Sequence, residues 1–116
     1  MGKTISEFVF DEFSDESKVQ QMFSFLSNEM DGNDFLEFDL VENKHTNRPD
    51  LHAFILLDKL IPGSTGDIID AAEHDEFYLS INIDDLEKVI TIEIAQELSR
   101  CGVMYNSDHD CLYMFA

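Results

Sequence analysis

Residues 91–115 read TIEIAQELSRCGVMYNSDHDCLYMF, and this stretch decides the fold that we expect. Thr91 is a typical N-cap residue, Glu93 suits the positive end of a helix, and apolar residues recur with a helical period as far as Arg100. Gly102 then ends the helix, because glycine adopts the left-handed conformation that helix C-termini often require.

Two apolar runs follow this glycine, and both alternate with a period of two. The polar cluster Asn106 to Asp110 separates them and is typical of a turn, so the sequence predicts a C-terminal β-hairpin. We expect Phe115 to be tied into the core, because a frayed tail would leave that apolar surface in water. The predicted core contains Phe23, Phe38, Leu79, Leu98 and Phe115.

The rest of the chain shows shorter apolar patterns separated by polar and glycine-containing turns. They predict strands over residues 5–10, 35–42 and 76–82, and helices over residues 14–30, 67–72 and 82–90. The apolar segment Leu51 to Ile61 fits either a buried helix or a strand, and its length favours the helix. Strands and helices do not alternate regularly. We therefore expect a single α+β domain over residues 1–116, with a mixed or antiparallel sheet flanked by helices.

The chain is strongly acidic, with 25 acidic residues against 7 basic ones and a formal net charge of −18. Hydrophobic residues make up 44% and include ten Phe, so the chain is expected to fold rather than to behave as a disordered acidic tail. Self-repulsion of this size opposes compaction, and we interpret the charge as functional. It disfavours direct binding of nucleic acid.

Sequence features also bear on location and on the two cysteines. No apolar run approaches the length of a membrane span and the first residues do not resemble a signal peptide, so we expect a cytoplasmic protein without a membrane contact. Cys101 and Cys111 could pair between the helix end and the hairpin, but in that compartment we expect both to stay reduced.

Residues Asp108 to Cys111, with His74 and Asp75, include side chains that bind zinc. Successive residues of a tight turn point in different directions, however, and the sequence has no Cys-x-x-Cys or His-Glu-x-x-His pattern. We expect no metal, no cofactor and no enzymatic activity. An enzyme would instead need a concave site that holds His109 or His74 beside a carboxylate of perturbed pKa.

The acids that neither capping nor turn formation explains are candidates for binding a partner. Glu37 and Asp39 alternate with apolar residues on the second predicted strand, which would place them about 7 Å apart on its solvent face. The predicted binding residues are Glu37, Asp39, Glu73, Asp75, Glu76, Asp108 and Asp110. If charge does not drive binding, the near-neutral segment Asn43 to Pro62 is the alternative surface.

The small size, acidity, α+β pattern and apolar core, together with the ending CGVMYNSDHDCLYMFA, resemble the immunity proteins that neutralise bacterial toxin domains, including those of contact-dependent growth inhibition systems. The resemblance is one of class and carries over no residue motif. It implies a cytosolic, non-enzymatic inhibitor that binds a cationic cognate nuclease toxin and blocks its active or substrate-binding surface. One alternative is a phage-encoded mimic of DNA charge that acts on a host restriction, repair or CRISPR nuclease. Another is an acidic protein of unassigned function.

Overall fold

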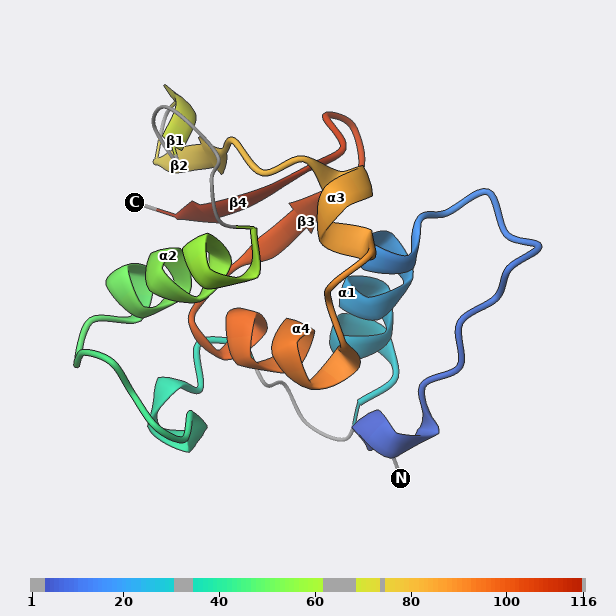
Figure 1. Cartoon of the computed structure of the whole chain (residues 1–116), viewed down its shortest axis with the longest axis horizontal. Coiled ribbons are helices and arrows are strands. Elements are labelled where there is room, and N and C mark those ends of the chain that lie inside the picture. The colour runs from blue at the N-terminus through green and yellow to red at the C-terminus, as the bar shows by residue number, and fades with distance from the viewer. Residues whose placement is uncertain (1–3, 31–34, 62–68, 74, 116) are drawn as a thin grey trace.

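The computed structural model describes residues 4–30, 35–61, 69–73 and 75–115, which form an α+β domain (Figure 1). The elements in chain order are η1 (Ile5–Glu7), α1 (Lys18–Asn28), η2 (Phe38–Leu40), α2 (Pro49–Leu60), β1 (Ile69–Glu73), β2 (Glu76–Leu79), α3 (Ile83–Glu87), α4 (Ile92–Arg100), β3 (Met104–Asn106) and β4 (Cys111–Phe115). The predicted fold class is therefore confirmed.

The sheet of the described residues has four strands in the order β1-β2-β4-β3, and every neighbouring pair is antiparallel. Strands β3 and β4 form the C-terminal hairpin that the sequence predicts. In the register of the sheet, Tyr78 of β2 lies opposite Tyr113 of β4, and Tyr105 of β3 lies opposite Leu112. The alternation along β4 buries Leu112 and Met114.

Helix α4 begins and ends as its sequence predicts. The Thr91 side chain accepts a hydrogen bond from the Ile94 amide, which satisfies a free donor of the first turn. Gly102 has φ +96°, and the Val103 amide donates to the Leu98 carbonyl beyond the last turn. Only glycine adopts this conformation at little cost, so the helix ends there and the chain turns into β3.

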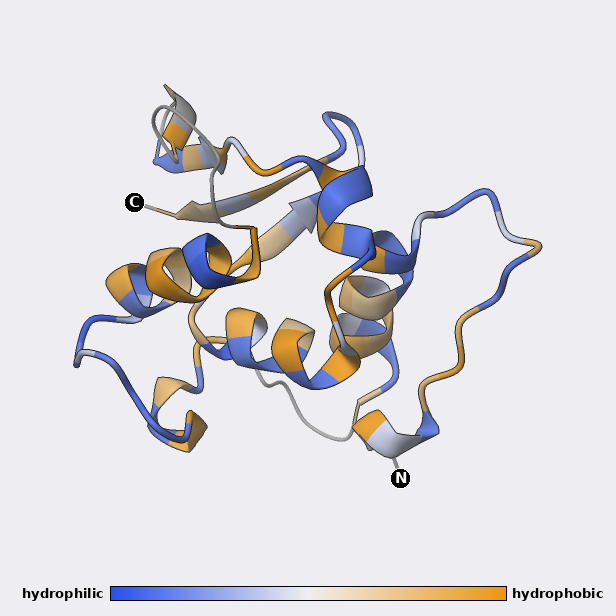
Figure 2. Cartoon of the chain, in the orientation of Figure 1, coloured by the Kyte–Doolittle hydropathy of each residue, from blue (hydrophilic) through white to orange (hydrophobic). Residues whose placement is uncertain are grey.

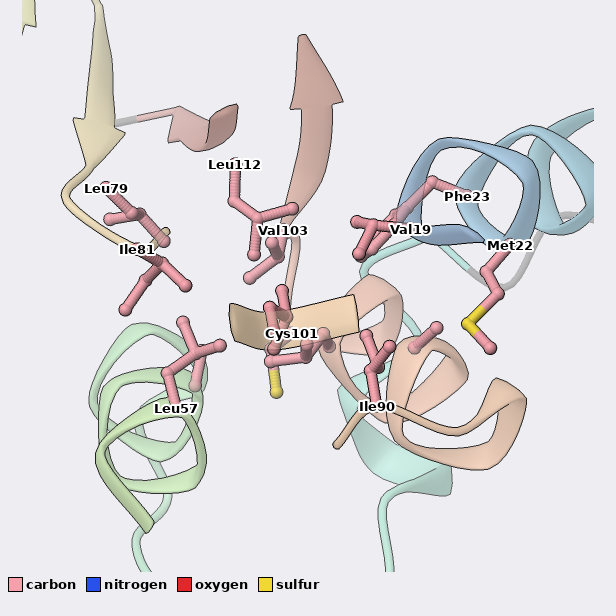
Figure 3. Close-up of a cluster of buried hydrophobic side chains, with 14 of the residues drawn as sticks. Val19, Met22, Phe23, Leu57, Leu79, Ile81, Ile90, Cys101, Val103 and Leu112 are labelled. Carbon is pink, nitrogen blue, oxygen red and sulfur yellow. The ribbon is translucent and has the colours of Figure 1, made fainter. Parts of the chain in front are cut away.

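The core lies between the sheet and helices α1, α2 and α4 (Figure 3). Figure 2 shows that each of these helices carries both apolar and polar positions. Fully buried side chains from each layer meet there: Val19 and Met22 of α1, Leu57 of α2, Leu98 of α4 and Leu112 of β4. Phe23, Leu79 and Leu98 of the predicted core are buried, and Phe38 is partly buried against it.

Phe115 does not lie in the core, because its side chain is 54% exposed. The period of two along β4 is predicted correctly, but the buried face is the other one. Leu112 and Met114 occupy it, with exposures of 0% and 4%. Leu112 and Met114 point into the core, so Tyr113 and Phe115, which alternate with them along β4, lie on the outer face of the sheet.

The two predicted N-terminal strands are wrong. Residues 5–7 form η1, in which the Glu7 amide donates to the Thr4 carbonyl, and residues 8–10 belong to no strand of the described sheet. Residues 38–40 form η2 instead of part of a strand. Leu36 has φ +61°, and its amide donates to the Ser99 carbonyl at the end of α4. This contact holds the backbone in a turn, which overrides the alternation of the sequence.

The helix predicted over residues 67–72 is also wrong for its described part. Residues 67 and 68 lie outside the described residues, and Ile69–Glu73 is strand β1. It pairs with β2, and this ladder satisfies backbone groups that a helix of one turn would leave largely unpaired. Helix α2 covers Pro49–Leu60, with Pro49 in its first turn, and the favoured interpretation of this segment is confirmed.

Candidate functional site

The tip of the β3–β4 hairpin holds two of the predicted binding residues in a fixed turn. The Asn106 side-chain oxygen accepts hydrogen bonds from the Asp108 amide at 2.8 Å and from the His109 amide at 3.1 Å. Asp110 has φ +49° and its carboxylate accepts a hydrogen bond from the Tyr105 hydroxyl. Both Asp108 and Asp110 are exposed. The turn therefore has a fixed backbone and presents two exposed carboxylates, of which that of Asp110 is held by Tyr105.

The Tyr105 phenol joins this tip to the start of α1. Burial, followed by the hydrogen bond to the Asp110 carboxylate, raises the pKa of Tyr105, while a hydrogen bond with the Ser17 side chain acts in the opposite direction. Ser17 is the N-cap of α1 and accepts a hydrogen bond from the Gln20 amide at 3.0 Å. The acids that precede this cap, Asp15 and Glu16, are exposed. The start of the helix and the hairpin tip thus form one continuous surface.

Helix α3 lies against the same end of α1. The Lys18 amide donates to Glu87 Oε1 at 2.6 Å, a contact across 69 positions of the chain. Asp84 and Asp85 occupy the first turn of α3 and are exposed. Figure 1 shows α3 next to α1 and below the hairpin tip. Three separate segments therefore contribute carboxylates to one side of the molecule.

We call this surface the acidic edge and define it by Asp15, Glu16, Asp84, Asp85, Glu87, Asp108 and Asp110. The same segments carry two lysines, Lys18 and Lys88, and Lys88 lies 3.8 Å from an Asp85 oxygen. Both partners of that pair are exposed, so the attraction is weak and leaves the edge strongly negative. The sequence showed Asp84 and Asp85 only as an adjacent pair among many acids. Contacts between distant segments bring them to the hairpin tip, and no local pattern indicates such contacts.

The outer face of the sheet adjoins the acidic edge, and Tyr78 lies between them. The Tyr78 ring makes an edge-on contact with the His109 ring at 5.5 Å between ring centroids, and its centroid lies 6.2 Å from that of Tyr113. The Tyr78 hydroxyl donates to a Glu76 oxygen at 3.1 Å. Burial and then the charge of Glu76 raise the pKa of Tyr113. Glu76 is therefore connected to the hairpin tip by a row of aromatic side chains.

The other predicted residues fall into two places. Asp75 is exposed in the turn between β1 and β2, and Glu73 pairs with Glu76 in the register of these strands. Glu37 and Asp39 are exposed at η2, which Figure 1 shows far from the hairpin tip. They lack the strand that was expected to align them.

Lys44 changes the local charge around η2. Its ammonium group lies 2.9 Å from the Val41 carbonyl oxygen and 3.4 Å from that of Asp39. It also lies 5.3 Å from the centroid of the Phe38 ring, within the range of a cation–π contact. A fixed cation next to Asp39 makes this surface less negative than the acidic edge.

A cavity of about 460 Å³ opens between α1 and β3, next to the acidic edge. Ser24 and Ser27 of α1, Tyr105 and Ser107 of the hairpin, and Tyr113 of β4 contribute to its lining. Its described lining consists of hydroxyl, amide, thioether, aromatic and aliphatic side chains and holds no Asp, Glu, Lys or Arg. In a chain of this charge, the cavity is a neutral site beside a negative one.

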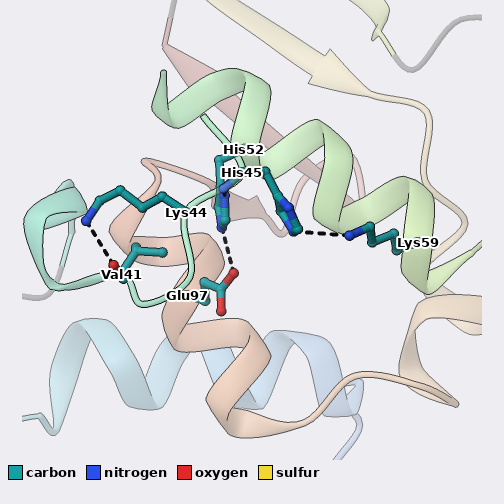
Figure 4. Close-up of polar contacts among 6 residues, drawn as sticks. All are labelled: Val41, Lys44, His45, His52, Lys59 and Glu97. Carbon is teal, nitrogen blue, oxygen red and sulfur yellow. Dashed lines mark hydrogen bonds and ion pairs between the residues drawn. The ribbon is translucent and has the colours of Figure 1, made fainter. Parts of the chain in front are cut away.

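A histidine and a carboxylate meet elsewhere, between α2 and α4 (Figure 4). His52 is 1% exposed, and its Nδ1 accepts a hydrogen bond from the His45 amide at 3.2 Å. The other nitrogen, Nε2, must then carry the proton and donates it to Glu97 Oε2 at 2.7 Å. Both ring nitrogens are engaged, so the pair fixes the loop before α2 to helix α4. No local pattern in the sequence indicates this pair.

The remaining candidates for chemistry do not form a site in the described residues. His109 is exposed at the hairpin tip, and His74 lies outside the described residues. Within the described ranges, no three His, Cys, Asp or Glu side chains are grouped as metal ligands would be. The helices described here are too short or too polar to cross a membrane.

Cys101 and Cys111, both described, are not joined by a disulfide, as the sequence predicts. Burial, with a smaller contribution from the charge of Glu97, raises the pKa of Cys101 to about 12. The buried thiol therefore stays protonated and behaves as a core side chain.

The comparisons with known proteins give no relative: the chain matches no protein-family model, no curated protein and no solved structure.

Proposed function

We propose that this chain is a non-enzymatic inhibitor that binds a cationic protein through the acidic edge. The observation that carries the proposal is the convergence of exposed carboxylates from the start of α1, from α3 and from the hairpin tip. Carboxylates gathered in this way attract a basic surface over a long range and speed its association.

The natural partner is a nuclease or another protein whose basic cleft binds phosphates. Such a cleft carries the Lys and Arg side chains that a nucleic-acid backbone requires, and the acidic edge offers it a competing array of negative charge. Occupation of the cleft would block access of the substrate. This mode of action is the one that the resemblance to cytoplasmic toxin-immunity proteins implies.

Two features of the edge suit a specific interface. The Asn106 side chain holds the backbone of Asp108, and the Tyr105 hydroxyl holds the Asp110 carboxylate, which reduces the conformational entropy lost when a partner binds the tip. The neutral cavity beside them, with Tyr105 in its lining, offers a place for an apolar side chain of the partner. Glu76, with the exposed Asp75 next to it, would extend the negative surface.

A pull-down from cells that express the native neighbouring genes tests the proposal. The baits are the unmodified chain, the variant Asp108→Lys/Asp110→Lys and the matched variant Glu37→Lys/Asp39→Lys, which makes the same change of charge at η2. We expect the unmodified chain and the η2 variant to retain a nuclease toxin and the edge variant to lose it.

Two other outcomes would change the assignment. Retention of a host restriction or repair nuclease instead of a toxin would assign the same edge to the phage-type inhibitor. Loss of the partner only with the η2 variant would move the interface to η2.

A further inference from the structure

The segment before α1 forms a small closed loop, residues 11–16, which we call the Phe13 loop. The side chain of Gln21 closes it: its oxygen accepts from the Asp11 amide at 2.8 Å, and its amide group donates to the Asp11 carbonyl at 3.0 Å. The same amide group donates to the Glu16 carbonyl at 3.0 Å. One side chain of α1 therefore holds both ends of the loop.

The tip of this loop carries an aromatic side chain in full contact with solvent. Phe13 is 96% exposed, and Val9, just before the loop, is 81% exposed. Figure 1 shows this segment extending away from the body of the molecule, and Figure 2 shows its apolar residues. The base of the segment is fixed, because the Phe8 ring packs edge-on against Phe25 of α1 at 5.5 Å. An exposed Phe on a tethered loop has no role in the core of this chain.

The charges around Phe13 restrict what can cover it. Asp11, Glu12, Asp15 and Glu16 are all exposed within the loop. An anionic membrane surface or a nucleic acid would be repelled by them. A second copy of the chain that packed loop against loop would bring the same carboxylates together. A protein with a positive surface is the occupant that these charges favour.

We propose that the Phe13 loop is the apolar anchor of the interface, with Phe13 packing against apolar side chains that are flanked by Lys or Arg on the cationic partner. This inference rests on the proposed function and adds the chemistry of the contact. The loop leads directly into Ser17 and the acidic edge, so both surfaces face one partner. Aromatic side chains that become buried at an interface often dominate the binding energy, and the Gln21 contacts reduce the entropy lost on docking.

A displayed library of short random peptides provides the probe, with the immobilised intact chain as the target. We expect the retained peptides to combine Lys or Arg with apolar residues, and their affinity to fall at least about tenfold for Phe13→Ala. Leu40→Ala is the matched control, because Leu40 is a 53% exposed apolar residue at η2, and it should leave the affinity unchanged. All three proteins should unfold at the same urea concentration.

The outcomes separate this inference from the proposed function. Peptides that lose affinity for Asp108→Lys/Asp110→Lys but not for Phe13→Ala would overturn the anchor and support the acidic edge. Peptides that depend on neither change, or a selection that retains none, would overturn the anchor, while the pull-down decides the proposed function separately. If sedimentation shows that the intact chain is a dimer and that Phe13→Ala makes it a monomer, the occupant is a second copy and the proposal is wrong.

Discussion

At the scale of single residues, the burial of a side chain decides how much it contributes to stability. Leu98 and Phe115 both belong to regular apolar patterns, yet Leu98 is fully buried and Phe115 is 54% exposed. A period of two tells which residues share a face of a strand but not which face the helices cover. The sequence likewise shows how many acids the chain has, but it does not show the contacts that bring those of the acidic edge together.

This difference in burial predicts that replacing the two side chains by alanine destabilises the fold by unequal amounts. Leu98→Ala removes a fully buried side chain and should lower the free energy of unfolding by about 3 kcal/mol. Phe115→Ala removes a side chain that is already half in water and should lower it by less than about 1 kcal/mol. Urea denaturation of both variants measures the two values, and equal losses would show that β4 packs differently.

At the scale of elements, the sequence predicted those that carry their own boundary signals. Helix α4 has Thr91 at its start and Gly102 after its end, and the hairpin has the polar cluster between its strands. The segments over residues 5–10 and 35–42 alternate as strands do, but their backbone groups bond locally or to the end of α4. Such contacts depend on the packed structure, so the alternation alone was misleading.

Gly102 provides a test of the boundary between α4 and β3. At φ +96° an alanine would be strained, and its Cβ would come within 2.7 Å of Leu36 Cδ2. We expect Gly102→Ala to lower the free energy of unfolding by about 1–2 kcal/mol, mostly through backbone strain.

The double variant Gly102→Ala/Leu36→Ala separates the two causes of this loss. It removes the contact with Leu36 and should recover only a small part of the stability, when each change is measured by urea denaturation in a full double-mutant cycle. Full recovery would show that the contact, and not the backbone conformation, requires glycine.

For the whole molecule, three buried or half-buried side chains that lose a proton at high pH, one thiol and two phenols, predict that alkali lowers the stability. The pKa of Cys101 is raised from 9.0 to about 12, and the pKa values of Tyr105 and Tyr113 are also raised. The unfolded chain releases these protons at lower pH than the folded chain does. Their contribution to stability is therefore complete below pH 9 and is lost as the pH rises toward 12.

Urea denaturation at about pH 8 and about pH 11 measures this loss. We expect a lower free energy of unfolding at the higher pH, and a smaller difference between the two values for Cys101→Ala, which lacks the thiol. A free energy of unfolding that does not change with pH would show that these groups are as accessible in the folded chain as in the unfolded one.

The central claim is that the acidic edge binds a cationic partner, and the rate of association with the partner identified by pull-down tests it most directly. At about 25 mM NaCl, Asp108→Lys/Asp110→Lys should slow association at least about tenfold, and the effect should shrink at about 250 mM NaCl. Glu37→Lys/Asp39→Lys should change the rate much less. A rate and an affinity that respond neither to salt nor to either pair of reversals would contradict the account and direct the search to the near-neutral segment Asn43 to Pro62.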